Sequence, residues 1–307
     1  MTYRLRQIPS ERSTLSELAD YMEVQCLISD EKIYSTTSGN STMGVIYDNY
    51  DEDEYDNNDF EDDDFDFREA LSEIEERNTK SNNNYPFISS DNIIKLKDDI
   101  NPLTLDIYIF LLLATRENMN ANKVANGIDG TALFEKLCAE VLHSYFGEKS
   151  ETFVFGTGGG NQSFQAKVED FLKKLKEGLS FRSPDGDRGR QKDGKIDVIA
   201  FIPFADTNKG QFIAFGQCKT GTNWKGVATQ LNPKSFCGSY ITPAIGFTPI
   251  VVYMVAESFF EDWENTARDT GGILFDRSRI MNYLPKQIDG SLLKDIQKWN
   301  KAVLARN

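Results

Sequence analysis

Short apolar runs with polar ends recur in the second half of the chain, between segments whose apolar residues are spaced three and four positions apart. The runs are typical of buried strands, and the spaced segments are typical of helices packed on one face. The pattern predicts helices at 130–146, 163–179, 224–236, 259–269 and 292–304, and strands at 197–203, 211–219, 249–256 and 272–275. Because strands and helices alternate, we expect an α/β (α+β) fold with a central mixed β-sheet flanked by helices on both faces.

The first hundred residues have a different pattern. A helix is expected just after Ser13 or Thr14, since either side chain suits an N-cap, and an apolar helix is expected from 102 to about 118. Polar segments and an acidic tract at 48–66 lie between these helices. We therefore expect a mainly helical recognition or regulatory region over 1–95 and an α/β domain over 96–307.

The composition favours a soluble protein. The chain has 307 residues, of which 39% are hydrophobic, enough to fill a sizeable core. Its most apolar segment, 105–114, is too short to cross a bilayer and includes Asp106. No basic segment followed by a long apolar one stands at the N-terminus, so we expect a cytoplasmic protein without a membrane partner.

Few residues are available for imidazole or thiol chemistry. His143 is the lone histidine, which argues against sites built from several imidazoles. The four cysteines occur singly, without the paired spacing of zinc or redox motifs, and we expect reduced thiols. Any catalytic site is therefore expected to rely on carboxylates, amides and lysine.

The net charge of −14 is unevenly distributed. About a dozen acidic residues, counted from the printed sequence, lie within 48–66, so the rest of the chain is close to neutral and can still present a basic groove. The acidic tract is interpreted either as a solvated loop or as an arm that docks on a basic partner or on the protein's own basic groove.

Three polar residues mark the ends of two predicted strands. Asp197 opens one strand, and Gln217 and Lys219 close the next, projecting to the same side because they are two residues apart. The connection at 204–210 is rich in turn-forming residues, so a hairpin is expected to bring the three side chains together. A structural alternative, in which Asp197 caps a strand and Lys219 lies on the surface, is kept open.

The residue types suit a magnesium site. Mg²⁺ prefers oxygen ligands, which Asp197, the amide of Gln217 and the backbone carbonyl of Cys218 offer. Glu135, on the predicted helix 130–146, is expected to hold a metal-bound water or a second ion, and Lys219 is expected to stabilise charge on a phosphate. This set allows metal-assisted phosphodiester hydrolysis without histidine.

Segments 134–142, 193–200 and 216–221 resemble the PD-(D/E)xK superfamily of restriction-endonuclease-like nucleases, and the Gln-x-Lys ending is similar to its Mrr-like branch. The resemblance covers about residues 128–280. It implies a restriction-endonuclease-like core in which Glu135 matches the helix glutamate, Asp197 the metal-binding aspartate and Lys219 the catalytic lysine. Gln217 stands where the family usually has Glu or Asp, and an amide oxygen carries no full charge.

Basic residues bracket the predicted site. Arg188, Arg190 and Lys192 precede Asp197, and Trp224 and Lys225 follow the second strand. We expect the basic side chains to contact a DNA backbone, and we expect Trp224 to pack either in the core or on a nucleotide.

The expected function is a Mg²⁺-dependent DNA endonuclease, in which Mn²⁺ can substitute for Mg²⁺. The resemblance makes a prokaryotic restriction or anti-phage defence system the expected context, with a partner protein from that system. Two cuts on a duplex usually need two active sites, so a homo-oligomer is expected. The alternative is a catalytically weakened binding or assembly module on the same fold, which recruits a partner protein through the acidic tract.

Overall fold

The computed structural model describes residues 4–5, 7–10, 12–47, 67–156, 162–183, 194–206, 208–227, 230–259 and 263–306, with the side chains of residues 42–47 excepted. The acidic tract at 48–66 lies outside the described residues. The helices are α1 (Leu15–Ile28), α2 (Thr36–Tyr47), α3 (Phe67–Lys80), α4 (Pro102–Arg116), α5 (Gly130–Phe146), α6 (Phe164–Leu175), α7 (Pro233–Tyr240), α8 (Trp263–Thr270), α9 (Arg277–Asn282) and α10 (Gly290–Leu304). The strands are β1 (Ile33–Ser35), β2 (Phe87–Ser90), β3 (Ile93–Leu96), β4 (Val124–Ala125), β5 (Ile128–Asp129), β6 (Glu151–Val154), β7 (Ser180–Phe181), β8 (Val198–Ile202), β9 (Phe212–Lys219), β10 (Ile241–Thr242), β11 (Ile250–Val255) and β12 (Ile273–Phe275).

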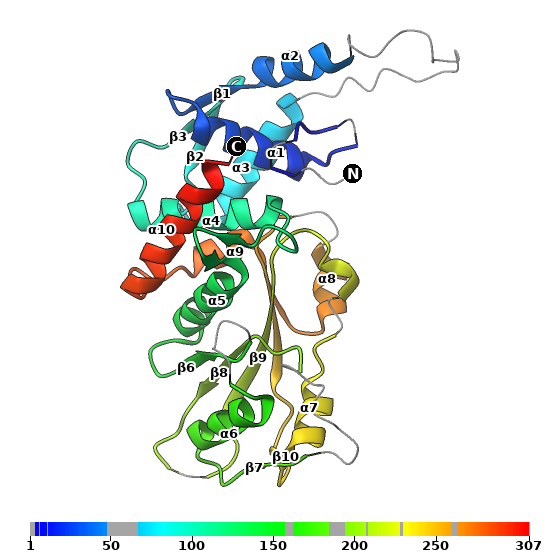
Figure 1. The fold of residues 1–307 in the computed structure, drawn as a ribbon, viewed down its shortest axis with the longest axis vertical. Helices are drawn as coiled ribbons and strands as arrows, with labels where there is room; N and C mark the ends of the chain where they lie inside the picture. Colours follow the sequence, from blue (N-terminus) through cyan, green and yellow to red (C-terminus); the bar gives the residue numbers. More distant parts are fainter. Residues whose placement is uncertain are drawn as a thin grey trace, which may run out of the picture.

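In the described part of the chain, five strands form a mixed sheet in the order β12-β11-β9-β8-β6. Strands β6, β8 and β9 pair antiparallel, whereas β9, β11 and β12 pair parallel. One face packs against α5 and the other against α6 and α7, because alternate residues of β8 and β9 enter two separate apolar clusters. The expectation of a mixed sheet flanked by helices is confirmed (Figure 1).

The predicted hairpin is present. Strand β8 pairs antiparallel with β9, with Val198 opposite Gly216 and Ile202 opposite Phe212. Five consecutive residues of β9 are buried, which matches the apolar run in the sequence. The hairpin therefore brings Asp197, just before β8, to the end of β9 that carries Gln217 and Lys219.

The first described elements form a second layer at one end of the molecule (Figure 1). Thr14 caps α1 and accepts from the Glu17 backbone N–H, and the Glu17 side chain accepts from Thr14 in return. Strands β1, β3 and β2 form a small antiparallel sheet that the sequence pattern did not predict. These strands have three or four residues with mixed burial, so their apolar pattern is weak.

A buried ionic cluster ties α1 to later parts of the chain. Asp20, fully buried on α1, accepts from Arg77 at 2.6 Å, from Arg116 at 2.5 Å and from Arg277 at 2.8 Å. Glu23 accepts from Arg77 at 2.7 Å. These three arginines hold the pKa of Asp20 well below its usual range, against the opposing effect of burial. The cluster joins helices α1, α3, α4 and α9.

One apolar cluster runs from Leu5 through α1, α3, α4 and α5 to Val303 on α10. The expected division between 1–95 and 96–307 therefore separates segments that share a core in the described residues. The division into a region 1–95 and a domain 96–307 stays a prediction. No helix in the part of the chain that the structure describes is long and apolar enough to span a bilayer.

Two helix predictions need correction. The expected helix at 224–236 is wrong: a 3₁₀ turn covers Lys225–Val227, and α7 begins only at Pro233, behind the N-cap Asn232. Helix α6 ends at Leu175 instead of 179, because Lys176 has a left-handed backbone with φ of 56°.

Candidate functional site

Asp197 is held on three sides by backbone hydrogen bonds. Its N–H donates to Gly216 at 2.8 Å, and its carbonyl accepts from Phe155 at 2.8 Å and Gly156 at 2.9 Å. Its carboxylate Oδ2 accepts from the Cys218 N–H at 2.8 Å. The carboxylate is therefore fixed at the end of strand β9.

Glu135, on helix α5, lies close to the Asp197 carboxylate. Helix α5, which carries it, begins at Gly130 behind the N-cap Asp129 and packs on the sheet, and Glu135 is buried. A Cβ placed on Gly156 would lie 2.8 Å from Glu135 Oε2 and 3.0 Å from Asp197 Oδ1. The two carboxylates thus converge on the Gly156 backbone, and we call this arrangement the Gly156 cradle.

Lys167 supports the cradle and was not predicted. Its buried ammonium donates to the Gly156 carbonyl at 2.8 Å. This contact fixes the backbone position on which the two carboxylates converge. The available signal was a lysine on the apolar side of α6, three residues after Phe164 and four before Phe171.

Gln217 lies at the same end of the β8–β9 pair as Asp197. The register ends with Val198 opposite Gly216, and Asp197, just before β8, donates its N–H to the Gly216 carbonyl. The Gln217 side chain is 1% exposed, and its Oε1 has no hydrogen-bond partner among the described residues. A buried amide oxygen without a hydrogen-bond donor destabilises the fold, so this oxygen is suited to bind a donor or a cation that the protein itself does not supply.

Tyr253, on the neighbouring strand β11, lies beside Gln217 and was also not predicted. It pairs with Gln217 in parallel register, is fully buried, and its hydroxyl likewise has no partner in the described residues. Burial, together with the nearby Asp197 carboxylate, raises the pKa of Tyr253, so the phenol stays protonated and can donate.

Lys219 and Cys218 complete the end of β9. Lys219 is half-buried, two residues beyond Gln217, and its carbonyl accepts from Ala256 at 3.1 Å on the β11 side. Since backbone directions alternate along a strand, the Cys218 carbonyl points to the β8 side, where Asp197 lies. Burial raises the pKa of the Cys218 thiol, which favours the carbonyl over the sulfur as a ligand.

These residues fit a magnesium ion by their donor types. The Gly156 cradle supplies two carboxylates, Gln217 supplies an unpartnered amide oxygen, and Cys218 a backbone carbonyl. All are hard oxygen donors of the kind that Mg²⁺ takes, with waters filling the remaining positions. No group of three or more His, Cys, Asp or Glu side chains that could hold a metal ion occurs in the described ranges.

The expected DNA-contacting residues have different outcomes. Arg188, Arg190 and Lys192 lie outside the described residues. Lys225 is exposed, with its ammonium 5.1 Å from the centre of the Phe259 ring. For Trp224 the core alternative is confirmed and the expected DNA contact is wrong: the side chain is 1% exposed and its indole N–H donates to Glu257 at 2.6 Å, so the ring is buried.

Comparison with protein-family models finds no match, and no curated protein matches the chain. Among solved structures, the chain aligns with the crystal structure of protein VC1899 from Vibrio cholerae at 12% identity and a TM-score of 0.16. That alignment covers 70% of this chain and 65% of the other, slightly less than two thirds of its length. A likeness at this level carries no conclusion about fold family or activity.

Proposed function

We propose that this chain is a Mg²⁺-dependent DNA endonuclease built on a restriction-endonuclease-like core. The observation that carries the proposal is the Gly156 cradle, in which carboxylates from helix α5 and from the start of β8 meet at one backbone position. Glu135 is buried and Asp197 is half-buried. Two carboxylates that converge away from bulk water repel each other and lose hydration, so their convergence favours a bound cation as a third partner.

In this proposal, Glu135, Asp197, Gln217 and the Cys218 carbonyl hold the metal. The ion, Mg²⁺ or Mn²⁺, supplies Lewis-acid chemistry and an activated water when bound. Lys219 places a positive charge on the same side of β9 as Gln217, where it stabilises charge on a scissile phosphate. Lys225, with Arg188, Arg190 and Lys192, contacts the DNA backbone.

The wider setting is part of the same proposal and rests on the family resemblance. We propose a role in prokaryotic restriction or anti-phage defence, with a homo-oligomer supplying two cutting sites for duplex DNA. A test is to measure the solution mass by light scattering with and without DNA. A species that is monomeric under both conditions, yet cuts both strands at one place, would overturn the oligomer.

The deciding experiment compares four forms of the full chain on plasmid, linear and single-stranded DNA with Mg²⁺ or Mn²⁺. Wild type is expected to cut at least one form, whereas Asp197→Asn and Lys219→Ala are expected to lose cleavage by about two orders of magnitude or more. Lys209→Ala is the matched control, because Lys209 is an exposed lysine in the same hairpin. Cleavage by Lys219→Ala at the rate of the control would contradict the role of Lys219 in stabilising the phosphate.

Gln217 favours a second candidate function. An amide in place of a carboxylate weakens cation binding, so the same core would serve as a DNA-binding or assembly module. DNA binding that is retained while no DNA form is cut under either metal would select this second function. Detection of metal-dependent cleavage that disappears in Asp197→Asn would exclude it.

A further inference from the structure

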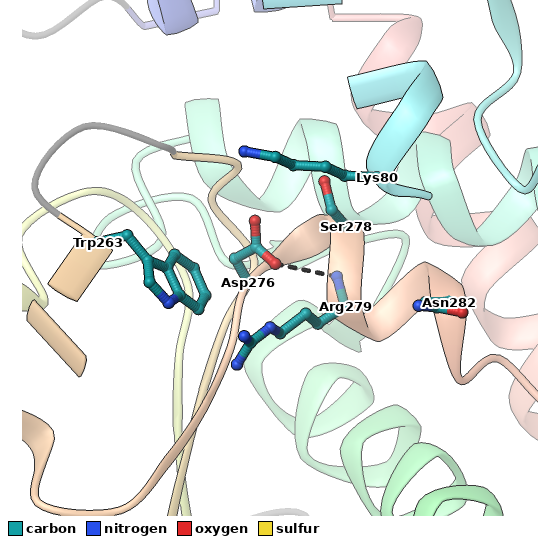
Figure 2. A pocket seen from close by; sticks show the side chains of 6 residues that line it. All are labelled: Lys80, Trp263, Asp276, Ser278, Arg279 and Asn282. Carbon is teal, nitrogen blue, oxygen red and sulfur yellow. Dashed lines mark hydrogen bonds between the residues drawn. The ribbon is translucent and has the colours of Figure 1, made fainter. Parts of the chain in front are cut away.

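A second group of polar side chains lies around a cavity of about 380 Å³. It is formed by the end of α3, the start of α8, the β12–α9 connection and α9 (Figure 2). The lining residues are Lys80, Trp263, Asp276, Ser278, Arg279 and Asn282. None of them belongs to the Gly156 cradle, so this cavity needs its own explanation.

Asp276 gives the cavity a buried hydrogen-bond acceptor. Its side chain is 1% exposed, and Oδ1 accepts from the Arg279 N–H at 2.9 Å. The other oxygen, Oδ2, has no partner in the described part of the chain. Figure 2 shows this oxygen directed into the space between Trp263 and Lys80. A ligand that donates an N–H there would satisfy an otherwise costly buried group.

Two cationic side chains stand beside this acceptor. Arg279 lies 4.3 Å from the centre of the Trp263 ring and donates one N–H to the Leu274 carbonyl at 2.8 Å, so its guanidinium is held in place. Lys80 forms an ion pair with Glu76 on its own helix, and both side chains are nearly half exposed. Such exposed pairs are weak and exchange readily for a stronger anion.

The cavity therefore combines the Asp276 carboxylate, which can accept an N–H, with Lys80 and Arg279, whose positive charges favour a phosphate. The ring of Trp263 is already engaged, because Phe259 stacks on it with ring centroids 5.1 Å apart and the Arg279 guanidinium lies 4.3 Å from its centre. A base would accordingly bind through its hydrogen-bonding edge and not by stacking. The volume lies in the range of small-molecule sites and exceeds what a free amino acid needs.

We propose that this cavity binds a nucleotide, with a base N–H on Asp276 and the phosphate at Lys80 and Arg279. This inference does not depend on nuclease activity. The ligand would touch α3, α8 and α9 at once, and so bridge elements from both ends of the sequence.

The first test is calorimetric titration of the full chain with AMP, GMP and UMP. Adenosine and inorganic phosphate serve as probes of the two halves of the ligand. At least one nucleotide is expected to bind saturably and more tightly than either half alone. Failure of all three nucleotides to bind, or saturable binding of glutamate without any nucleotide binding, would overturn the proposal.

Three variants assign the contacts. Asp276→Asn keeps an oxygen to cap α9 but replaces the unpartnered oxygen by an N–H donor, so nucleotide affinity is expected to fall about tenfold or more while phosphate affinity is retained. Arg279→Gln and Lys80→Gln are expected to weaken both nucleotide and phosphate. Lys95→Gln, an exposed lysine paired with Asp98, is the matched control.

Thermal melting of each variant checks the fold, and asparagine is a favoured capping residue, so Asp276→Asn is expected to remain folded. Equal nucleotide affinity in all three cavity variants and in Lys95→Gln would refute the site. Asp197→Asn is expected to bind nucleotide as wild type does, which separates a failure of this proposal from a failure of the nuclease assignment.

Discussion

At Gly156 two carboxylates converge on one backbone position. Replacing this glycine by alanine would put a methyl group 2.8 Å from Glu135 Oε2 and 3.0 Å from Asp197 Oδ1, closer than such contacts normally are. We expect Mn²⁺ to raise the melting temperature of wild type, and we expect Gly156→Ala to displace the carboxylates and to show no such rise.

Gly238→Ala is the control, because a Cβ at that position in α7 meets nothing within 4 Å. It is expected to keep the full Mn²⁺ response and to raise stability by roughly 0.5–1 kcal/mol, since alanine is a better helix former. An undiminished Mn²⁺ response in Gly156→Ala would contradict the cradle as a metal site.

Gln217 offers a test that adds a charge instead of removing one. Gln217→Glu would bury a third carboxylate near Asp197, so the metal-free protein is expected to melt at a lower temperature than wild type. Saturating Mn²⁺ is expected to raise its melting temperature by more than it raises that of wild type, because a carboxylate binds the ion more strongly than an amide.

Gln211→Glu is the matched variant. Gln211 precedes the other end of β9, is 1% exposed, and its Oε1 also has no partner among the described residues. It is expected to destabilise the protein without any added Mn²⁺ response. The same response to Mn²⁺ in both variants would show that Gln217 does not face the metal.

Residue type and strand position were enough to single out Asp197, Gln217 and Lys219, because polar residues at the ends of buried strands are conspicuous. Lys167 and Tyr253 were missed for a physical reason. Their roles depend on which backbone groups lie opposite them, and that follows from the packing of α6 and from the pairing of β9 with β11. A lysine or tyrosine in an apolar segment carries no local sign of such a partner.

Among the elements, the start of α9 gives a prediction about pH. Burial raises the pKa of Asp276 to about 6, above its value in an unfolded chain. Its protonation therefore stabilises the fold fully below about pH 4, and this contribution is lost as the pH rises through about 6. We expect Asp276→Asn to be more stable than wild type at pH 7.5, by up to about 3 kcal/mol, and to lose that advantage at pH 4.

Asp289, the exposed N-cap of α10, provides the comparison. Hydrogen bonds from Ser291 and Leu292 lower the pKa of Asp289, so its contribution is present above the unfolded value and is lost as pH falls. Asp289→Asn is therefore expected to lose stability at pH 7.5. Denaturant unfolding at both pH values measures the two variants, and a pH-independent gain in Asp276→Asn would contradict the buried ionisation.

Elements with strong local signals were predicted well. Helices α4 and α5 have clear caps in Asn101 and Asp129, and their bounds lie close to those expected. The helix predicted at 224–236 is wrong over its first part, where Lys225–Val227 form only a 3₁₀ turn. A helix starts only where Asn232 and Pro233 supply a cap and a fixed first turn.

For the whole molecule, the buried ionic cluster makes the N-terminal elements part of the main fold. Asp20 bonds Arg277, and Arg277 in turn donates to the Ala256 carbonyl at 3.0 Å, whose own N–H donates to Lys219. We expect Asp20→Ala to cost about 3–5 kcal/mol, because it leaves buried guanidinium groups without their carboxylate. Asp98→Ala, at an exposed pair with Lys95, is expected to change stability by less than about 1 kcal/mol.

The same cluster predicts the behaviour of a truncated chain. A protein restricted to 96–307 lacks Asp20, Glu23 and the α1 and α3 side chains of the shared core, so it is expected to be largely insoluble or to lack a cooperative melting transition. Calorimetry and near-ultraviolet circular dichroism of the purified fragment are the measurements. A fragment that melts cooperatively near the wild-type temperature would establish an independent domain.

Sequence patterns alone could not predict that α1 is joined to later helices by a buried ionic cluster. Asp20 and Glu23 lie on a helix whose charged residues look like a solvated face, and burial of charge depends on partners far along the chain, at Arg77, Arg116 and Arg277. Local composition suggested a separate N-terminal region, whereas the arginines that neutralise α1 come from three other helices.

Gly156 also bears on how descendants of this protein can diverge. The position tolerates no side chain as long as both carboxylates must stay in place. Under the proposed nuclease function, a lineage selected for metal-dependent cutting therefore has to keep glycine there. A lineage that abandons cutting is released from that requirement and can accept alanine or serine without harming the sheet. The identity of this one residue in orthologous sequences would then separate working enzymes from copies that retain only the scaffold, before any of them is purified.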